Sequence, residues 1–337
     1  MQGFNMGRYV PPDLEGTVSG NALHAKLPPG RSAAKPGVQT VRFEMPFAIC
    51  MTGKQIGLVT GGASGMGLEV AISLASDEWI VYILDLNASS GQAAVEANPQ
   101  LQFIQVDVAS WKSLSLAFDV VFKSHGRLDF VFANAGILQL ENFYSKDTSL
   151  PPAEPRQHSI DINLKAVINT CHLARHYFLA CEHPAPGPAL VITASIASSY
   201  AQEFNPIYTA TKAGVLGFMR SIATPYYREG IRTYAICPGT VRTNLLSSLV
   251  WDKFPEEYVT PLETIVYAVR TLIAGGDMKD TRGQIVPKGK DYGLAVECFV
   301  KDIFFRDQME FINDGMRQIC EAASLENQRD NLHLQQI

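Results

Sequence analysis

Short apolar runs alternate with segments of helical spacing along most of the chain from Lys54 onward. The runs, rich in Val and Ile, predict buried strands at 56–60, 79–85, 101–107, 128–136, 189–195, 231–239 and 283–287. The segments between them predict helices at 65–77, 111–124, 156–182, 206–229 and 261–274. Strands that are apolar on both faces need helices over each face, and strand–helix–strand crossovers are right-handed. We therefore expect an α/β fold built on a single doubly wound parallel sheet.

The two ends of the chain are expected to lie outside this domain. Residues 299–325 look helical and complete a domain over 51–325, which leaves 326–337 as a frayed tail. Residues 1–50 hold six prolines and no sustained apolar period, so we expect a disordered extension. Two stretches of it, MQGFNMGRYVPPDLEGTVSGNALHAK and VRFEMPFAIC, resemble the N-terminus of a spliceosome-associated coiled-coil-domain family. That resemblance stops at Cys50, where the family's zinc ligands would follow, so we expect Met51 to be the natural start of an enzyme.

The overall charge argues against nucleic acid or an anionic membrane as a partner. Lys and Arg total 28 against 33 Asp and Glu, which gives a net charge of −5. No apolar run reaches the ~18 residues that a membrane span needs. The six cysteines form no CxxC pair and have no histidines at zinc spacing. We therefore expect reduced thiols, no metal and a cytoplasmic location.

A glycine-rich loop, TGGASGMG (60–67), follows the first predicted strand and opens the first predicted helix. In this strand–turn–helix context the pattern predicts a dinucleotide site. Gly61 permits the tight turn, Gly65 lets the backbone approach a pyrophosphate, and Gly67 allows close packing of helix on strand. The remaining loop positions in this binding prediction are Thr60, Ser64 and Met66. The helix N-terminus would supply N–H donors for the phosphates.

Asp85 ends the second predicted strand, 18 residues after Gly67. A carboxylate there can accept hydrogen bonds from both hydroxyls of an adenosine ribose and would repel a 2′-phosphate. The following residues, Leu86 and Asn87, offer no cation for such a phosphate. The sequence therefore favours NAD over NADP.

Tyr208 and Lys212 stand at i and i+4 on a predicted helix, and therefore project from one face. A neighbouring ammonium favours the phenolate, which would let the tyrosine act as a base or an acid near neutral pH. Ser195 lies 13 residues before Tyr208, at the carboxyl end of a predicted strand, where ligands bind in open α/β sheets. Its hydroxyl could hold a substrate oxygen beside the phenol.

Taken together, these motifs resemble the short-chain dehydrogenase/reductase family over about residues 54–290. The resemblance rests on TGGASGMG, Asp107-Val108, NAG (134–136), Ser195, YTATK (208–212) and PGTVRT (238–243). It implies a Rossmann domain in which Asp107 binds the adenine amino group, Val108 packs on the ring, and Asn163 positions a water that relays protons from Lys212. It further implies that the cofactor lies near Asn134, Ala135 and Gly136, and against Pro238, Gly239, Val241 and Thr243. The family often has a second Asn before Asn134, where this chain has Ala133.

The sequence thus predicts an NAD-dependent oxidoreductase that transfers a hydride between nicotinamide and a secondary alcohol or ketone. The apolar stretch LLSSLVWDKFPEEY (245–258) follows the cofactor turn, where the family places a substrate lid, so we expect a small hydrophobic, lipid-like or secondary-metabolite substrate. Family habit implies a homodimer or homotetramer. Three alternatives stay open: an NADP-dependent ketoreductase, a non-catalytic NAD-binding sensor or scaffold, and an RNA-processing adaptor that acts through residues 1–50.

Overall fold

The computed structural model describes residues 53–138, 142–146, 148–184, 186–243 and 254–328. All of them belong to the unit Pro46–Ile337, and the fold below is the fold of that unit. The predicted extension at 1–50 and the predicted tail at 326–337 fall almost entirely outside the described residues, as does most of the predicted lid. No helix among the described residues is long and apolar enough to cross a membrane.

An eight-stranded sheet forms the centre of the fold, in the order β10-β9-β6-β5-β4-β1-β2-β3. The strands are β1 (Ile56–Thr60), β2 (Ile80–Asp85), β3 (Leu101–Gln105), β4 (Phe130–Ala133), β5 (Ala189–Thr193), β6 (Arg232–Pro238), β9 (Leu294–Phe299) and β10 (Asp302–Arg306). Every neighbouring pair is parallel apart from β9 and β10, which form an antiparallel hairpin. The chain runs outward from β1 in both directions, so the expected doubly wound sheet is confirmed.

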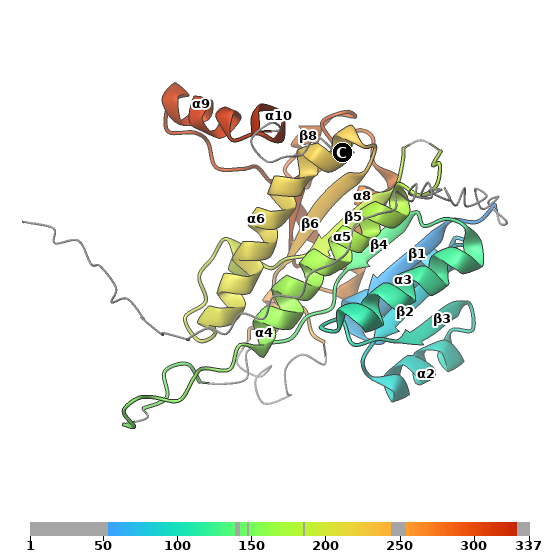
Figure 1. Ribbon diagram of the computed structural model, residues 1–337, viewed down its shortest axis with the longest axis horizontal. Helices are drawn as coiled ribbons and strands as arrows, with labels where there is room; N and C mark the ends of the chain where they lie inside the picture. The colour runs from blue at the N-terminus through green and yellow to red at the C-terminus, as the bar shows by residue number, and fades with distance from the viewer. Residues whose placement is uncertain (1–52, 139–141, 147, 185, 244–253, 329–337) are drawn as a thin grey trace, which may run out of the picture. The chain divides into compact units, whose positions relative to one another are not determined.

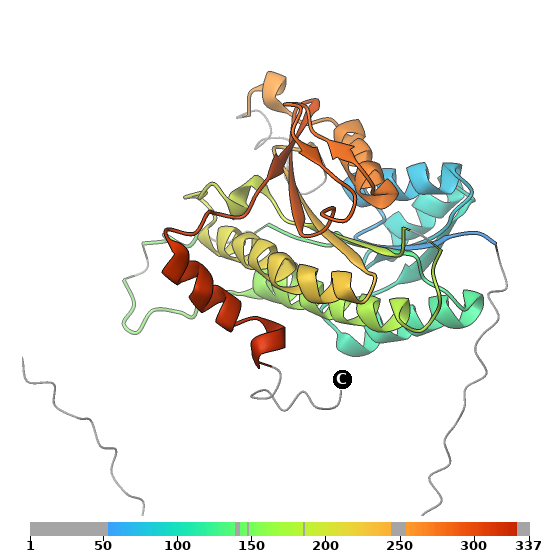
Figure 2. The same cartoon turned by 90° about the horizontal axis from the view of Figure 1, so that it is seen from above.

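Helices cover both faces of this sheet (Figures 1 and 2). One face packs against α3 (Trp111–His125), α5 (Ala166–Phe178) and α6 (Pro206–Arg228). The other face packs against α1 (Gly65–Ser76), α2 (Ala88–Ala97) and α8 (Leu262–Ala274). The strands β1, β4, β5 and β6 are buried along their whole length between these layers, as their continuous apolar runs predict.

Two helical segments differ from the sequence prediction. The helix expected at 156–182 is shorter: a turn α4 (His158–Ile160) leads through a π-helical turn (Asp161–Lys165) into α5, which ends at Phe178. The helix α2 was not expected, because its sequence ASSGQAAVEA is small and polar. It packs on the sheet through a small residue: a Cβ on Gly91 would lie 2.2 Å from the Phe103 ring.

The carboxyl-terminal part of the prediction was wrong in two places. The run at 283–287 does not join the main sheet: β8 (Ile285–Val286) pairs with β7 (Met278–Lys279) in a separate antiparallel pair. Residues 299–325 are not continuously helical, since they begin with the β9–β10 turn and the strand β10 and only then form α9 (Asp314–Ala322) and α10 (Leu325–Gln328). Ile303 and Phe305 of β10 are both buried on the face of the sheet that α8 covers. Burial of every second residue favours a strand at this edge.

The β9–β10 turn is held by two threonines from the start of α8 and the loop before it. Thr260 Oγ1 accepts a hydrogen bond from the Val300 N–H at 3.0 Å, and Thr264 Oγ1 donates to the Val300 carbonyl at 2.7 Å. Val300 has φ +53°, a left-handed conformation that a valine adopts only when its surroundings enforce it. These contacts fix the hairpin beside the carboxyl end of β6, where the loop 238–243 begins.

Candidate functional site

A cavity of about 260 Å³ opens at the carboxyl edge of the parallel strands. It lies where the chain reverses its winding direction between β1 and β4, the usual ligand position in this class of sheet. Its lining residues come from the last residues of β2 and β5, from the loops after β1, β4 and β6, and from the starts of α1 and α6: Gly61, Ser64, Gly65, Met66, Asp85, Asn134, Ala135, Gly136, Thr193, Tyr208, Lys212 and Thr243.

The glycine-rich loop forms one wall of this cavity. Gly65 begins α1 with φ +53°, and a Cβ there would lie 3.0 Å from Thr243, so only glycine leaves this wall open to a ligand. Gly67 has another role, because a Cβ on it would lie 2.3 Å from the Gly61 carbonyl oxygen. It lets α1 start close against the loop. The first N–H groups of a helix have no partner within that helix, so this helix start suits a pyrophosphate.

Asn134 ties three strand ends together beneath the loop. Its Nδ2 donates to the carbonyl oxygens of Thr60 and Gly61, both at 3.2 Å, and its Oδ1 accepts a hydrogen bond from Thr193 Oγ1 at 3.0 Å. The hydroxyl oxygen of Thr60 in turn accepts from the N–H groups of Asn134 and Ala135. These bonds join the ends of β1, β4 and β5. They fix the cavity floor before any ligand binds.

Asp85 lies at the end of β2 with its carboxylate in the cavity wall. Its Oδ2 accepts a hydrogen bond from the Ala63 N–H at 3.2 Å, and its Oδ1 accepts from the Asn87 N–H at 3.0 Å. The neighbouring Leu86 is 63% exposed. Apart from Lys212, no Lys or Arg lines the cavity among the residues that the structure describes. The Asp85 end of the cavity is therefore acidic.

Tyr208 and Lys212 face each other from successive turns of α6. The Lys212 ammonium nitrogen lies 5.7 Å from the centroid of the Tyr208 ring. Its Nζ donates a hydrogen bond to the Thr193 carbonyl oxygen at 2.8 Å. Burial of this side chain, which is 3% exposed, lowers the pKa of Lys212 to about 8. The amine is still mostly charged at neutral pH but loses its proton within the weakly alkaline range.

Ser195 follows β5 and is within reach of the Tyr208 phenol. The sequence suggested a phenol made more acidic by Lys212, but burial raises the pKa of Tyr208, and the nearby Ser195 hydroxyl opposes that rise without cancelling it. Ser195 Oγ also accepts a hydrogen bond from the Ala197 N–H at 3.1 Å. This second bond fixes the serine rotamer at the start of the short helical turn Ile196–Ser198. Ser195 thus lies beside the Tyr208 phenol, just behind the residues that line the cavity.

Asn163 is fully buried in the π-helical turn before α5. Its side chain binds the Ile137 backbone on both sides, with Nδ2 donating to the Ile137 carbonyl and Oδ1 accepting from the Ile137 N–H, each at 2.8 Å. A Cβ on Gly136 would lie 3.3 Å from Asn163 Oδ1 and 3.6 Å from Lys212 Nζ. Because Gly136 has no side chain, a narrow space remains between Asn163 Oδ1 and Lys212 Nζ. π-Helical turns are frequent at functional sites.

The structure brings most of the predicted site residues to the cavity wall, but not all. The predicted residues that do not line it are Thr60, Gly67, Asp107, Val108, Asn163, Ser195, Pro238, Gly239 and Val241. Several of them act from behind the wall, as Thr60 and Asn163 do. Asp107 is exposed, and its carboxylate accepts a hydrogen bond from the Ala109 N–H. Val108 and Val241 are buried.

Thr193 is a site residue that sequence reasoning missed. It lines the cavity, donates to Asn134 and supplies the carbonyl that binds Lys212. The only signal in the sequence was its position two residues before Ser195. The predicted lid at 245–258 cannot be placed on the cavity, because residues 245–253 lie outside the described part of the chain.

Comparisons with known proteins agree with this fold. Residues 55–253 match the family model described as short chain dehydrogenase. The chain belongs to the short-chain dehydrogenase/reductase family, whose members are oxidoreductases that bind a nicotinamide cofactor, NAD or NADP. The glycine wall, the acidic end and the fixed floor described above fit such a cofactor.

Individual relatives extend the comparison. "Short-chain dehydrogenase/reductase prx7" of Penicillium rubens is 42% identical over 78% of this chain and 98% of its own length. The human "15-hydroxyprostaglandin dehydrogenase [NAD(+)]" is 30% identical over 61% of this chain and 75% of its own length. The crystal structure of a 3-ketoacyl-(acyl-carrier-protein) reductase from Brucella melitensis, complexed with NADH, superposes with a TM-score of 0.59 at 19% identity. It covers 73% of this chain and 96% of the reductase, and it supports the fold alone.

Proposed function

We propose that the protein is an NAD-dependent oxidoreductase that transfers a hydride between nicotinamide and a secondary alcohol or ketone. One observation carries the proposal. A buried lysine and a tyrosine line one end of a cavity whose other wall is a glycine-rich helix start, and a serine lies beside that tyrosine. Such a site combines a proton donor with a binding place for a dinucleotide.

The residues around the glycine wall would hold the cofactor. The N–H groups at the start of α1 and the open wall at Gly65 suit its phosphates, and Thr243 borders the same space. Asp85 would accept hydrogen bonds from the ribose hydroxyls. A 2′-phosphate would meet that carboxylate and an exposed Leu86 instead of a cation, which favours NAD. The name of the human relative, a dehydrogenase of NAD(+), points the same way.

The chain's own side chains would manage the proton. When bound, the nicotinamide ring supplies or accepts the hydride at the substrate carbon. Tyr208 would give its phenol proton to the carbonyl oxygen in reduction, or take the proton from the alcohol in oxidation. Ser195 would hold the same oxygen by a hydrogen bond. Lys212, with its ammonium 5.7 Å from the Tyr208 ring, would stabilise the phenolate after the proton has left.

Asn163 would act on this machinery by positioning. Its amide holds Ile137, the residue after the Asn134–Gly136 wall, so that this wall stays against Lys212. We retain the proposal that a water near Asn163 passes protons from Lys212 toward solvent. Since both polar ends of the Asn163 amide bind Ile137, the side chain would serve mainly to shape the space for that water.

The proposed substrate is a small hydrophobic alcohol or ketone. Two considerations support it: the apolar composition of residues 245–254, next to the cofactor turn, and the hydroxyprostaglandin named for the human relative. We further propose that the protein works as a homodimer or homotetramer in the cytoplasm.

A paired kinetic assay tests the proposed function. Purified protein is given a panel of hydrophobic secondary alcohols with either NAD⁺ or NADP⁺, and reduced nicotinamide is followed by absorbance. The proposal expects turnover with kcat/KM at least about tenfold higher for NAD⁺, since removing a charge conflict of ~1.4 kcal/mol changes a ratio tenfold. A preference for NADP⁺ would identify the ketoreductase alternative. NAD⁺ binding without turnover on any alcohol or ketone would favour the sensor alternative.

A further inference from the structure

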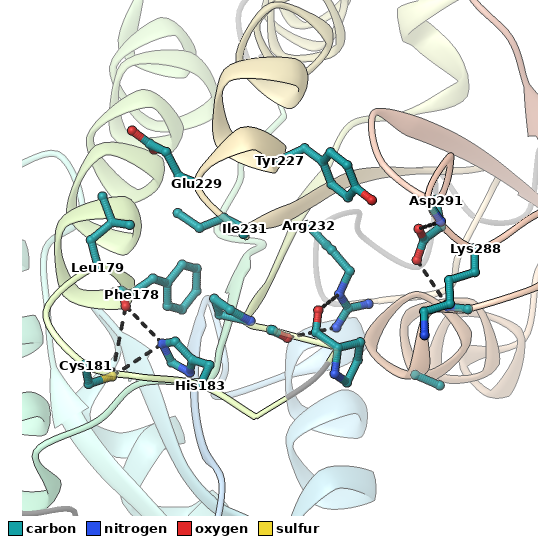
Figure 3. Close-up of a pocket in the computed structure, with 17 residues that line it drawn as sticks. Phe178, Leu179, Cys181, His183, Tyr227, Glu229, Ile231, Arg232, Lys288 and Asp291 are labelled. Atoms are coloured by element: carbon teal, nitrogen blue, oxygen red, sulfur yellow. Dashed lines mark hydrogen bonds between the residues drawn. The ribbon is translucent and has the colours of Figure 1, made fainter. Parts of the chain in front are cut away.

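A second, larger cavity lies at the other edge of the parallel sheet. Its volume is about 820 Å³, and it is formed where α5 and α6 end and where β5 and β6 begin. Parallel strands begin at one edge and end at the other, so this cavity is at the opposite edge from Tyr208 and Lys212. Figure 3 shows Cys181 and His183 side by side in its wall, next to the Phe178 carbonyl.

The hydrogen bonds of His183 define its protonation state. Its Nδ1 lies 3.2 Å from Asp129 Oδ1, and its Nε2 lies 2.9 Å from the Phe178 carbonyl oxygen. A carboxylate and a carbonyl are acceptors without a proton to give. Both ring nitrogens of His183 therefore donate, and a ring with two N–H groups is a cationic imidazolium.

Asp129 is well placed to support this charge. Its carboxylate accepts hydrogen bonds from Arg127 Nε and from the Ile56 N–H, both at 2.8 Å, in addition to His183. Burial raises the pKa of Asp129, but the hydrogen bonds from His183, Arg127 and Ile56 outweigh it, so the pKa is lowered. Burial likewise lowers the pKa of His183, but Asp129, Cys181 and the Phe178 carbonyl raise it to about 9. The pair stays ionised at neutral pH.

Cys181 lies against this cation. Its Sγ is 3.3 Å from His183 Nε2, and the residue is partly exposed at the cavity wall. An imidazolium at this distance stabilises negative charge on sulfur. The other described cysteines differ: Cys320 is exposed on α9, and three are buried. Burial raises the pKa of Cys171, Cys237 and Cys298, which keeps them as inert thiols.

The rest of the cavity combines apolar surface with charged groups that are mostly paired already. Phe178, Leu179 and Ile231 contribute apolar surface (Figure 3). Four further charged groups line it, and three already have partners. Glu229 pairs with Arg175, Arg232 donates to the carbonyls of Pro186, Gly187, Leu272 and Ile273, and Asp291 accepts from the N–H groups of Gly276 and Gly289. The fourth is Lys288.

We propose that Cys181, paired with His183, is a nucleophile that forms covalent adducts with small uncharged α,β-unsaturated carbonyl compounds in this cavity. The thiolate lone pair forms a bond from Sγ to the β-carbon, while the C=C π bond breaks and its electron pair moves onto the α-carbon and the carbonyl oxygen. His183 Nε2 gives its proton to that anion, and solvent returns a proton to the ring. Nothing is oxidised or reduced overall, and no leaving group is released.

The test uses N-ethylmaleimide, a compound of this class, on the full-length protein. The protein is exposed to less than one equivalent at pH 6, 7 and 8, and each cysteine peptide is quantified by mass spectrometry. The proposal expects Cys181 to be labelled at least about tenfold faster than Cys320 at pH 6, where an ordinary thiol with pKa ~8.5 holds little thiolate. Equal or slower labelling of Cys181 at pH 6 would overturn it.

A matched variant assigns the effect to the imidazolium. In His183→Gln the cysteine is unchanged but the cation is gone, so the advantage of Cys181 over Cys320 at pH 6 should fall by about tenfold or more. The buried Cys171 must remain unlabelled, which reports that the variant is folded. Unchanged fast labelling in folded His183→Gln would contradict the proposal. If this variant unfolds, the labelling of the wild-type protein at pH 6, 7 and 8 still tests the proposal. Tyr208→Phe should label as the wild type does, which separates this site from the proposed catalysis.

Discussion

Asn163 binds Ile137 through both backbone groups of that residue, with two hydrogen bonds of 2.8 Å. The pair joins the π-helical turn before α5 to the loop that follows β4. Because Gly136 packs between Asn163 and Lys212, this pair determines how closely the cavity wall approaches the lysine. A residue that is distant in sequence thus shapes the Lys212 end of the cavity without lining it.

Replacing Asn163 should affect both stability and turnover. Asn163→Ala leaves the N–H and carbonyl of Ile137 without partners, which should lower the free energy of unfolding by about 1–3 kcal/mol. If Asn163 positions the wall against Lys212, kcat should also fall about tenfold or more, while the Kd for NAD changes by less than about threefold. Denaturant unfolding and steady-state kinetics measure the two effects. The exposed neighbour variant Lys165→Gln is the control, and a kcat equal to that of the control would contradict the positioning role.

Cofactor choice should depend on Asp85. Asp85→Ala combined with Leu86→Arg removes a repulsive carboxylate and adds a phosphate partner at a position that is 63% exposed. We expect kcat/KM for NADP to rise and that for NAD to fall, so that the ratio moves by about tenfold or more. Asp85→Asn serves as the control that removes the charge without adding a cation, and should give an intermediate ratio. A ratio that does not move in the double variant would show that Asp85 does not face the ribose.

The pH dependence of ketone reduction should report Lys212. Its pKa is lowered by burial to about 8, so the ammonium is present below that pH and is lost as pH rises through it. The pKa of Tyr208 is raised by burial, so the phenol keeps its proton over the same range. We expect kcat to be steady between about pH 6 and 7 and to fall above about pH 8. The Lys212→Arg variant keeps its positive charge over this range. The kcat that it retains should therefore not fall above about pH 8. A wild-type kcat that stays level up to pH 9.5 would contradict the assignment.

His183 should make folding stability depend on pH in a defined window. Its pKa in the folded protein is raised to about 9, above the ordinary value of 6.5. The folded state therefore holds a proton that the unfolded state releases, and the stabilisation is complete below about pH 6.5 and lost as pH rises to about 9. The loss should be on the order of 3 kcal/mol at most. Urea unfolding of the wild type and of His183→Gln at pH 6 and 9 measures it, and an equal pH dependence in both proteins would rule out this ion pair as the cause.

The order of elements could be predicted from the sequence wherever apolar runs were continuous. The strands β1, β2, β4 and β5 are such runs, and the turn residues between them mark their ends. The hairpin β9–β10 could not be predicted in this way. The triplet Ile303-Phe304-Phe305 is as compatible with a buried helix as with a strand. Only its pairing with β9 makes it a strand. The helix α2 was missed because it packs through glycine and alanine instead of large apolar residues.

For the site, the sequence predicted those groups that are linked by local spacing. Tyr208 and Lys212 are one helical turn apart, and Gly61 and Gly65 lie in one loop. The hydrogen bond from Lys212 to the Thr193 carbonyl depends on where β5 ends relative to α6. No local residue pattern predicts that position. Contacts between distant segments were equally inaccessible. His183 and Asp129 are 54 residues apart, and they meet only because β4 and β5 are neighbours.

The most direct test of the account is the behaviour of Tyr208→Phe. The variant removes a single hydroxyl group from a partly buried ring, so folding and cofactor binding should be preserved. Its Kd for NAD, measured by fluorescence titration, should stay within about threefold of the wild type, while kcat should fall by about 10²–10⁴-fold because the proton transfer is lost. Near-wild-type turnover in a folded variant that binds NAD would contradict the central claim that Tyr208 exchanges the proton with the substrate oxygen.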